Sequence, residues 1–373
     1  MSSQERITGF DSLRFFMVVL VIALHSAMTY MEFVPAWWYV IDGEKSFEFA
    51  LLVVFLDSFP MTALFFLAGY FAPPSLDKRG ARTFVRDKFT RVGIPWILGL
   101  VFVAPFFAHA SLVAVGLPSP GVIEFVRGYF FGVFYQQGHY WFLGTLFLFL
   151  AVYAAYADVS ERDGAPFLFF SSSPVGLIAG LWVVSVLTYF LSGKFVKPAV
   201  EWLNLGYVVY FQPARIIGYI GVFALGVHGW RSNWFKRGGW APSLPVCGVL
   251  AVVSSVLLLA FTFYISPGKS PIYALTAEAI TYNAVCLSMT LFLSSVFMKA
   301  SGPIHNLTKY FEANSYAIYW LHLIILMPML RMMKPLAISI YLKWAASLVA
   351  TILVCDLLAR FVLKKAPLLK RFF

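Results

Sequence analysis

The chain has 373 residues and a mean hydropathy of +0.80, and 61% of its residues are hydrophobic whereas 12% are charged. Water-soluble domains contain about 25% charged residues, and a single soluble core cannot enclose so many apolar side chains. The composition therefore excludes a soluble protein and indicates an all-α, polytopic membrane protein. The net charge of +11 indicates orientation and contact with anionic membrane lipids, not nucleic-acid binding.

Apolar runs of spanning length predict ten transmembrane helices. Nine or eleven are the alternatives, because residues 122–135 could form an interfacial amphipathic helix and polar residues interrupt the fifth run. All belong to one predicted membrane domain, residues 1–373. The predicted spans are residues 13–32, 49–72, 93–115, 139–157, 174–191, 207–229, 244–265, 279–298, 314–332 and 337–361.

Charge placement predicts the orientation of these spans. With the N-terminus inside, eighteen basic residues fall in the inner segments and seven in the outer ones. Because basic residues concentrate on the cytoplasmic side, we expect both termini there. No small-residue cleavage site follows the first run, so we expect it to be a retained anchor.

The first apolar segment carries three ionisable residues, Asp11, Arg14 and His25. The eleven-residue step from Arg14 to His25 is about three helical turns, so both side chains project from nearly one face, roughly 16 Å apart along the axis. Asp11 lies one turn before Arg14 on the same side. With Arg14 at the water boundary, His25 would lie near the bilayer midplane, where an ionisable group indicates function. The alternative is a structural histidine bonded to a hydroxyl on a neighbouring helix.

The loop after the second span has six basic residues in fourteen positions, residues 78–91. Lys88 and Arg91 lie one turn apart, a spacing that suits a pair of phosphates, and Arg86 precedes them. This pattern predicts a site for a polyanionic cytoplasmic donor. The alternative is charge that only sets orientation and contacts anionic lipid.

Polar groups also lie in the later spans. His139 and Trp141 begin the fourth span at the predicted outer rim, where they could meet a sugar or be structural. Arg215 follows Pro213, which we expect to interrupt the hydrogen bonds of the sixth span. A buried arginine needs a partner, and the candidates are Asp57, Glu278 or a substrate carboxylate. Structural and catalytic roles both stay open for two further interior groups, His322 and Asp356.

Motifs for other chemistries are absent from the sequence. The three cysteines lie singly in apolar runs without Cys-x-x-Cys spacing, so neither a disulfide framework nor a zinc site is expected. The chain has no P-loop, GxSxG elbow, HExxH or dinucleotide fingerprint. We therefore expect no metal and no tightly bound cofactor.

Several motifs together resemble the acyltransferase-3 family of membrane O-acyltransferases. The segment RITGFDSLRFFMVVLVIALH resembles the family's opening, with ten residues between its arginine and its histidine. Further matches are FFLAGYF (65–71), KFTRVGIPW (88–96), HYWFLGTLFLF (139–149) and SYAIYWLH (315–322). With the terminal PLLKRFF, the chain looks most like the glucan biosynthesis protein C (glucan succinyltransferase) branch.

The resemblance implies ten helices around a pore-like site, and transfer of an acyl group from cytoplasmic acyl-CoA, as co-substrate, to a carbohydrate across the bacterial inner membrane. The branch implies succinyl-CoA and a periplasmic glucan. The family's paired arginines on the third helix correspond to Lys88 and Arg91. The expected roles are catalysis by His25, Arg14 and Asp11, donor binding by Lys88, Arg91, Arg86 and Arg215, and acceptor binding by His139 and Trp141.

Two other functions fit the same pattern. An O-acetyltransferase would use acetyl-CoA and another exported polysaccharide or lipid-linked sugar. A transporter would also place interior charges on helices around a midplane site. A transporter is expected to show a repeat between its halves, and no such repeat is evident in the sequence.

Overall fold

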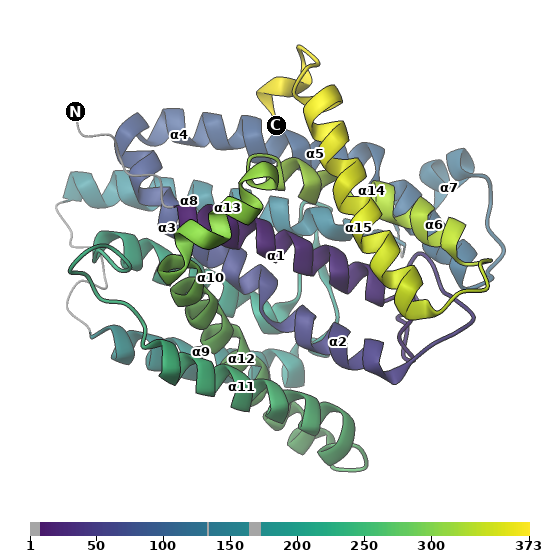
Figure 1. The fold of residues 1–373 in the computed structure, drawn as a ribbon, viewed down its shortest axis with the longest axis horizontal. Helices are drawn as coiled ribbons and strands as arrows, with labels where there is room; N and C mark the ends of the chain where they lie inside the picture. The colour runs from purple at the N-terminus through teal and green to yellow at the C-terminus, as the bar shows by residue number, and fades with distance from the viewer. Residues whose placement is uncertain (1–7, 133, 164–172) are drawn as a thin grey trace.

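The computed structural model describes residues 8–132, 134–163 and 173–373, and it is a bundle of helices with one short hairpin (Figure 1). The first half contains α1 (Thr8–Ala27), α2 (Phe47–Ser58), α3 (Pro60–Arg79), α4 (Ala81–Lys88), α5 (Ile94–Phe102), α6 (Ala104–Ala114), α7 (Val122–Gly128), α8 (Trp141–Asp163) and α9 (Pro174–Phe195). The second half contains α10 (Pro213–Arg231), α11 (Leu244–Ala260), α12 (Pro271–Lys299), α13 (Ser301–Glu312), α14 (Ser315–Met333) and α15 (Ile340–Leu358). The strands β1 (Leu203–Leu205) and β2 (Val209–Phe211) pair antiparallel before α10.

The described residues contain eight helices long and apolar enough to cross a membrane, or nine if the bent pair Ala81–Phe102 and Ala104–Ala114 forms one span. The predicted all-α, multi-pass class is therefore confirmed. The sixth predicted span, residues 207–229, corresponds to α10, which is not among these nine although it has 19 residues. In residues 122–135, an alternative in the count, the described positions (122–132 and 134–135) form one short helix, α7.

Two predicted boundaries differ from the structure. The first span was expected at 13–32, but α1 begins and ends five residues earlier, so His25 lies in its last turn and not at its middle. The sixth span was expected to contain a proline that breaks its hydrogen bonds. Instead, residues 209–211 form β2 and Pro213 occupies the first turn of α10, where a missing N–H costs nothing.

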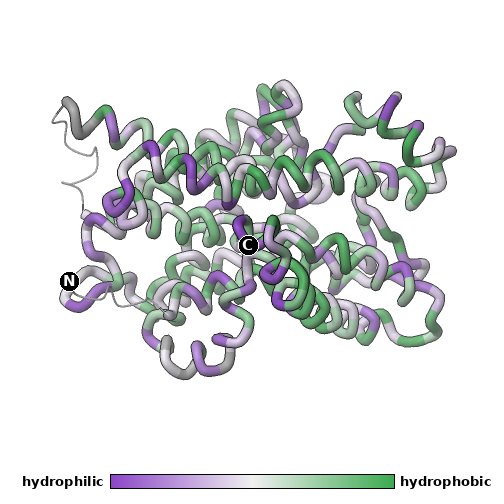
Figure 2. Tube along the Cα trace, turned by 90° about the horizontal axis from the view of Figure 1, so that it is seen from above, coloured by the Kyte–Doolittle hydropathy of each residue, from purple (hydrophilic) through white to green (hydrophobic). Residues whose placement is uncertain are grey.

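Hydrophobic residues dominate the long helices, and hydrophilic residues are frequent in the turns at their ends (Figure 2). The helices α9 and α11 lie at the periphery and bury few residues, so large apolar side chains such as Leu187 and Val252 are exposed. By contrast, α1 contacts α2, α3, α12, α13, α14 and α15. The bundle therefore encloses α1 and turns an apolar surface outward, as a membrane requires.

The beginning of α1 and the end of α15 lie at the same end of the bundle. Ser12 in α1 bonds to Glu312, the last residue of α13. At the other side of α13, the guanidinium of Arg360 bonds to the Tyr310 carbonyl, and Lys364 donates to the Ala313 carbonyl at 2.9 Å. The opposite end of the bundle therefore holds the last turn of α1 and the loop that follows it.

Close packing of α3 against α10 depends on two glycines. A Cβ on Gly69 would lie 2.0 Å from the Phe223 carbonyl oxygen, and one on Gly226 would lie 2.2 Å from the Phe66 carbonyl oxygen. Both obstacles are backbone atoms, which cannot rotate away. Only glycine lets the two helices approach this closely.

We predict that Gly69→Ala and Gly226→Ala each lower the free energy of unfolding by about 1–3 kcal/mol, because the helices must move apart. Thermal unfolding in detergent measures the change. Gly180→Ala in α9 is the matched control, since a Cβ there meets no heavy atom within 4 Å. Equal melting temperatures for all three variants would contradict the proposed packing.

Candidate active site

Three histidines from distant parts of the chain lie together inside the bundle. His25 is in the last turn of α1, His139 is in the 3-10 turn Gly138–Tyr140 before α8, and His322 is in α14. Nδ1 of His25 lies 2.9 Å from Nε2 of His322, and their rings are nearly parallel with centroids 5.1 Å apart. The His139 ring meets His322 edge-on at 4.4 Å. His139 and His322 are 3% and 0% exposed, whereas His25 is half-buried.

Sequence reasoning did not find this cluster. It placed His139 at the outer rim; in the structure the His139 side chain is buried, and nearby Gln136 accepts a hydrogen bond from the Tyr39 hydroxyl at 2.9 Å. It left the role of His322 open. His25 and His322 are 297 positions apart, and no sequence signal indicates their contact.

Backbone carbonyls of α14 fix the two buried histidines. Nδ1 of His322 lies 2.5 Å from the Tyr319 carbonyl oxygen, and Nε2 of His139 lies 3.2 Å from that of Trp320. The Tyr319 hydroxyl in turn donates to the His139 carbonyl at 2.6 Å. Nδ1 of His139 is buried and has no hydrogen-bond partner among the described residues. An unpaired buried nitrogen of this kind is available to a substrate hydroxyl.

The loop between α1 and α2 covers the end of α1. The Trp38 ring stacks on His25 with centroids 5.6 Å apart, and its indole N–H donates to the Thr29 hydroxyl at 3.1 Å. Lys343 of α15 holds the same loop through a buried ion pair with Asp42 at 3.2 Å. His25 therefore lies beneath an anchored loop, not at an open surface.

The predicted pair at the other end of α1 is present. Arg14 and Asp11 form an ion pair at 3.3 Å, and the Arg14 guanidinium lies 5.7 Å from the centre of the Phe71 ring. The Arg14 side chain is 38% exposed, so it can meet a ligand from that end of the bundle. Arg14 and His25 project from one helix about three turns apart, as expected.

Lys88 extends this cationic region. It is the last residue of α4, it is half-buried, and its ammonium lies 5.2 Å from the centre of the Phe84 ring. Lys88 interacts electrostatically with three arginines, Arg14, Arg79 and Arg91. The structure thus brings the basic residues after the second predicted span close to Arg14 on the first helix.

The remaining predicted donor contacts, Arg86 and Arg91, are exposed. A π-helical turn, Phe89–Gly93, follows Lys88 and connects α4 to α5. Such turns are rare and often occur at functional sites. The predicted loop is therefore helical at these residues, with Lys88 at the end of α4 and Arg91 in the π-helical turn.

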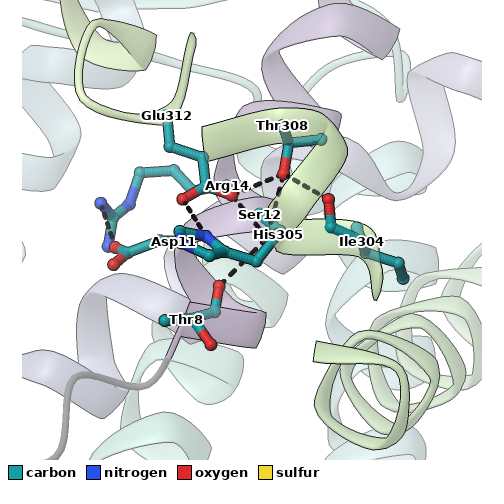
Figure 3. Close-up of polar contacts among 8 residues, drawn as sticks. All are labelled: Thr8, Asp11, Ser12, Arg14, Ile304, His305, Thr308 and Glu312. Atoms are coloured by element: carbon teal, nitrogen blue, oxygen red, sulfur yellow. Dashed lines mark hydrogen bonds and ion pairs between the residues drawn. The ribbon is translucent and has the colours of Figure 1, made fainter. Parts of the chain in front are cut away.

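A buried carboxylate holds α13 against the first turn of α1 (Figure 3). Oε1 of Glu312 accepts hydrogen bonds from the hydroxyls of Ser12 at 2.6 Å and Thr308 at 2.5 Å, and Oε2 lies 2.8 Å from Nδ1 of His305. Figure 3 shows this group beside the Asp11–Arg14 pair. This contact was not predicted, because no predicted span includes α13.

Arg215 is paired with Asp57, one of its three expected partners, at 2.7 Å. Its guanidinium lies 4.6 Å from the centre of the Tyr282 ring, and its side chain is 6% exposed, whereas that of Asp57 is 47% exposed. Glu278, another candidate, accepts instead from the Tyr189 hydroxyl at 2.8 Å. A cavity of ≈ 10 Å³, about enough for one water molecule, lies next to Arg215.

Trp141 belongs to a group of aromatic side chains beside the hairpin. It is half-buried, and its ring centroid lies 5.2 Å from Trp202, which stacks on Tyr210 of β2 at 4.9 Å. Nearby, burial raises the pKa of Tyr135 to about 12, so its hydroxyl stays protonated and donates to the Tyr207 carbonyl at 2.5 Å. The aromatic group is thus fixed to the loops that surround the histidines.

No group of three or more His, Cys, Asp or Glu side chains within residues 8–132, 134–163 and 173–373 could hold a metal ion. His25 is hydrogen-bonded to His322, and His322 and His139 are each hydrogen-bonded to a backbone carbonyl of α14. Their arrangement suits proton transfer or nucleophilic attack by an imidazole.

A family model described as an acyltransferase domain matches residues 7–360, from the start of α1 to the turn after α15. The chain belongs to the acyltransferase-3 family. This acyltransferase-3 protein is therefore an acyl-group transferase and a multi-pass membrane O-acyltransferase, and the three histidines and Arg14 all lie within the matched range. No curated protein and no solved structure gives a significant match. The likeness to the glucan biosynthesis protein C branch stays a prediction.

We predict that Glu312→Ala lowers the free energy of unfolding by about 1–3 kcal/mol, because the hydroxyls of Ser12 and Thr308 lose their buried acceptor. Lys309→Ala, on the exposed side of the same helix, is the control and should have little effect. Thermal unfolding in detergent compares the two. Similar melting for both variants would show that Glu312 does not hold α13 in place.

Proposed function

We propose that the protein transfers an acyl group, specifically succinyl, from cytoplasmic acyl-CoA to a periplasmic glucan. The observation that carries this proposal is the position of His25, which bonds to a second buried histidine at one end of α1 while the cation Arg14 marks the other end. The donor can then approach the Arg14 end of α1 and the acceptor the His25 end, from opposite faces of the bundle.

The donor would bind at the cationic end. Arg14 and Lys88 lie within electrostatic reach of each other, and exposed Arg86 in α4 and Arg91 in the π-helical turn lie on either side of Lys88 in the chain. Phosphate groups of CoA bind favourably to such arginine and lysine clusters. Arg14, held by Asp11, would orient the donor or stabilise the negative charge that develops on it.

His25 would carry out the transfer in one of two ways. As a general base, it removes the proton of the sugar hydroxyl, the oxygen attacks the thioester carbon, the C–S bond breaks, and the proton passes to the thiolate. As a nucleophile, its nitrogen displaces the thiolate and forms an acyl-imidazole, from which the sugar oxygen then takes the acyl group. In the second route the hydroxyl releases its proton and the thiolate takes one up.

The acceptor would bind from the other end, near His139 and Trp141. The unpaired Nδ1 of His139 could accept a hydrogen bond from a sugar hydroxyl. The aromatic group of Trp141, Trp202 and Tyr210 offers ring faces of the kind on which sugars stack.

Arg215 is the proposed cation for the free carboxylate of a succinyl group. Its pairing with Asp57 favours the competing function, an O-acetyltransferase acting on another exported polysaccharide or lipid-linked sugar, because that donor needs no cation within the bundle. The succinyl carboxylate would have to displace Asp57, whose half-exposed side chain can move away.

The proposed location is the bacterial inner membrane, with both termini in the cytoplasm. Two observations support this orientation. The start of α1 and the end of α15 lie at one end of the bundle, and the basic loop around Lys88 lies there too.

The donor and acceptor can be identified by mass spectrometry of cell-envelope glucans from strains with and without the gene. We expect glucans with the mass of a succinyl group only when the gene is present. Acetyl-modified sugars in place of succinylated glucan would favour the competing function.

We predict that His25→Ala abolishes transfer, a loss of at least about 10²–10⁴-fold, because the variant lacks the base or nucleophile. Activity is measured in membranes with matched amounts of inserted protein. His109→Ala is the control, since this half-buried histidine bonds only locally to Ser119 and Pro120. Ordinary activity in His25→Ala would remove the basis of the proposed mechanism.

We predict that Arg215→Leu reduces transfer from succinyl-CoA more than transfer from acetyl-CoA, because only the succinyl group carries a carboxylate. The two donors are compared in one preparation with the same acceptor. An equal loss for both donors would identify the contact with Asp57 as a structural ion pair.

A further inference from the structure

We propose that His322 is a positioning residue that holds the proton of His25 on Nδ1, so that the lone pair of Nε2 carries out acyl transfer. This inference rests on the proposed function of His25 and adds which atom acts and what selects it. It is argued from hydrogen-bond chemistry in three steps, beginning at the far side of His322.

The first step is the contact between His322 and Tyr319. Nδ1 of His322 lies 2.5 Å from the Tyr319 carbonyl oxygen. A carbonyl oxygen only accepts hydrogen bonds, so Nδ1 of His322 must carry a proton. Tyr319 is itself held by the bond from its hydroxyl to the His139 carbonyl, which keeps this acceptor in place.

The second step is the charge of His322. The residue is 0% exposed, and its ring is packed against the rings of His25, His139 and Tyr319, which offer no negative charge. An uncompensated imidazolium in such surroundings is costly, so His322 is neutral. A neutral imidazole carries one N–H, which leaves a lone pair on Nε2.

The third step uses the lone pair on Nε2 of His322 to place the proton of His25. Nε2 of His322 accepts, and it lies 2.9 Å from Nδ1 of His25, so Nδ1 of His25 must donate. The Nε2 atom of His25 is then the nitrogen without a proton. Stacking on Trp38 at 5.6 Å holds the ring in this orientation.

Both routes of transfer need that lone pair. As a base, Nε2 takes the hydroxyl proton and later gives it to the departing thiolate, while the C–S bond breaks and the C–O bond forms. As a nucleophile, Nε2 forms a C–N bond to the acyl carbon as the C–S bond breaks. A proton on Nε2 would block either route, and His322 prevents this.

The tautomer can be measured directly. Solid-state ¹⁵N NMR of the full-length protein, labelled at histidine and reconstituted in lipid bilayers, distinguishes protonated from unprotonated ring nitrogens. The His25 signals are assigned by difference from His25→Gln. We expect the proton on Nδ1, and a proton on Nε2 of His25 would overturn the inference.

Three variants of His322 test the consequence for catalysis. In His322→Gln the amide oxygen can replace Nε2 as the acceptor for His25, so we expect kcat within about tenfold of the unsubstituted protein. His322→Asn keeps a donor for the Tyr319 carbonyl but cannot reach His25, and His322→Leu loses both contacts. For these two we expect kcat to fall about 10²–10⁴-fold, as when a catalytic histidine loses the partner that fixes its tautomer.

The KM values separate positioning from substrate binding. His322 lies behind His25, so we expect the KM for acyl-CoA and for the acceptor to stay the same in all three variants. Equal kcat for His322→Gln and His322→Leu, or a rise in KM with kcat unchanged, would contradict the positioning role. If a variant fails to fold, the NMR measurement on the unsubstituted protein still shows which nitrogen of His25 carries the proton.

The outcome also separates this inference from the proposed function. Full activity of His25→Ala would end the proposed role of His25, on which this inference rests, whatever the tautomer. An essential His25 with its proton on Nε2 would leave the proposed function in place and end only the positioning role of His322.

Discussion

The contact between His25 and His322 is the interaction on which the site depends. Imidazoles buried in an apolar bundle need hydrogen-bond partners, since an unpaired buried polar group costs about 1–3 kcal/mol. Here the partners form a chain that runs from His25 to His322 and on to the Tyr319 carbonyl. The same series of hydrogen bonds joins α1 to α14, so the site forms only when these two helices pack against each other.

The two ends of the site lie at the two ends of helix α1. At its first turn, Glu312 ties it to α13 beside the cationic group of Arg14 and Lys88. At its last turn, the tryptophan Trp38 covers His25. Because the helix is rigid, the eleven-residue step from Arg14 to His25 sets the distance between the donor end and the histidine. The geometry suits a chemistry whose two substrates arrive from opposite faces.

Much of the fold follows from the sequence. Apolar runs predict nine of the spanning segments, and serine before proline marks the starts of α9 and α12, where Ser173 and Ser270 cap the helices. The predicted start of the sixth span was wrong, because its apolar run begins at residue 207 although residues 209–211 form a strand and α10 begins at Pro213. A hydropathy profile gives the length of an apolar run, but it does not detect where the backbone stops being helical.

The site could be predicted only where its residues share one helix. The spacing of Asp11, Arg14 and His25 places them on one face, because helical geometry is local. The contact of His25 with His322 and the pairing of Arg215 with Asp57 depend on which helices are neighbours. In a membrane protein, side chains facing lipid and side chains facing other helices are equally apolar, so periodicity does not reveal those neighbours.

The most direct test of the central claim is transfer across a sealed membrane. Proteoliposomes of known orientation carry the carbohydrate acceptor inside, and acyl-CoA is supplied outside, at the face of Arg14 and Lys88. The account predicts acylated acceptor in these vesicles and none when the protein has the opposite orientation. Transfer only when both substrates are on one side would contradict it.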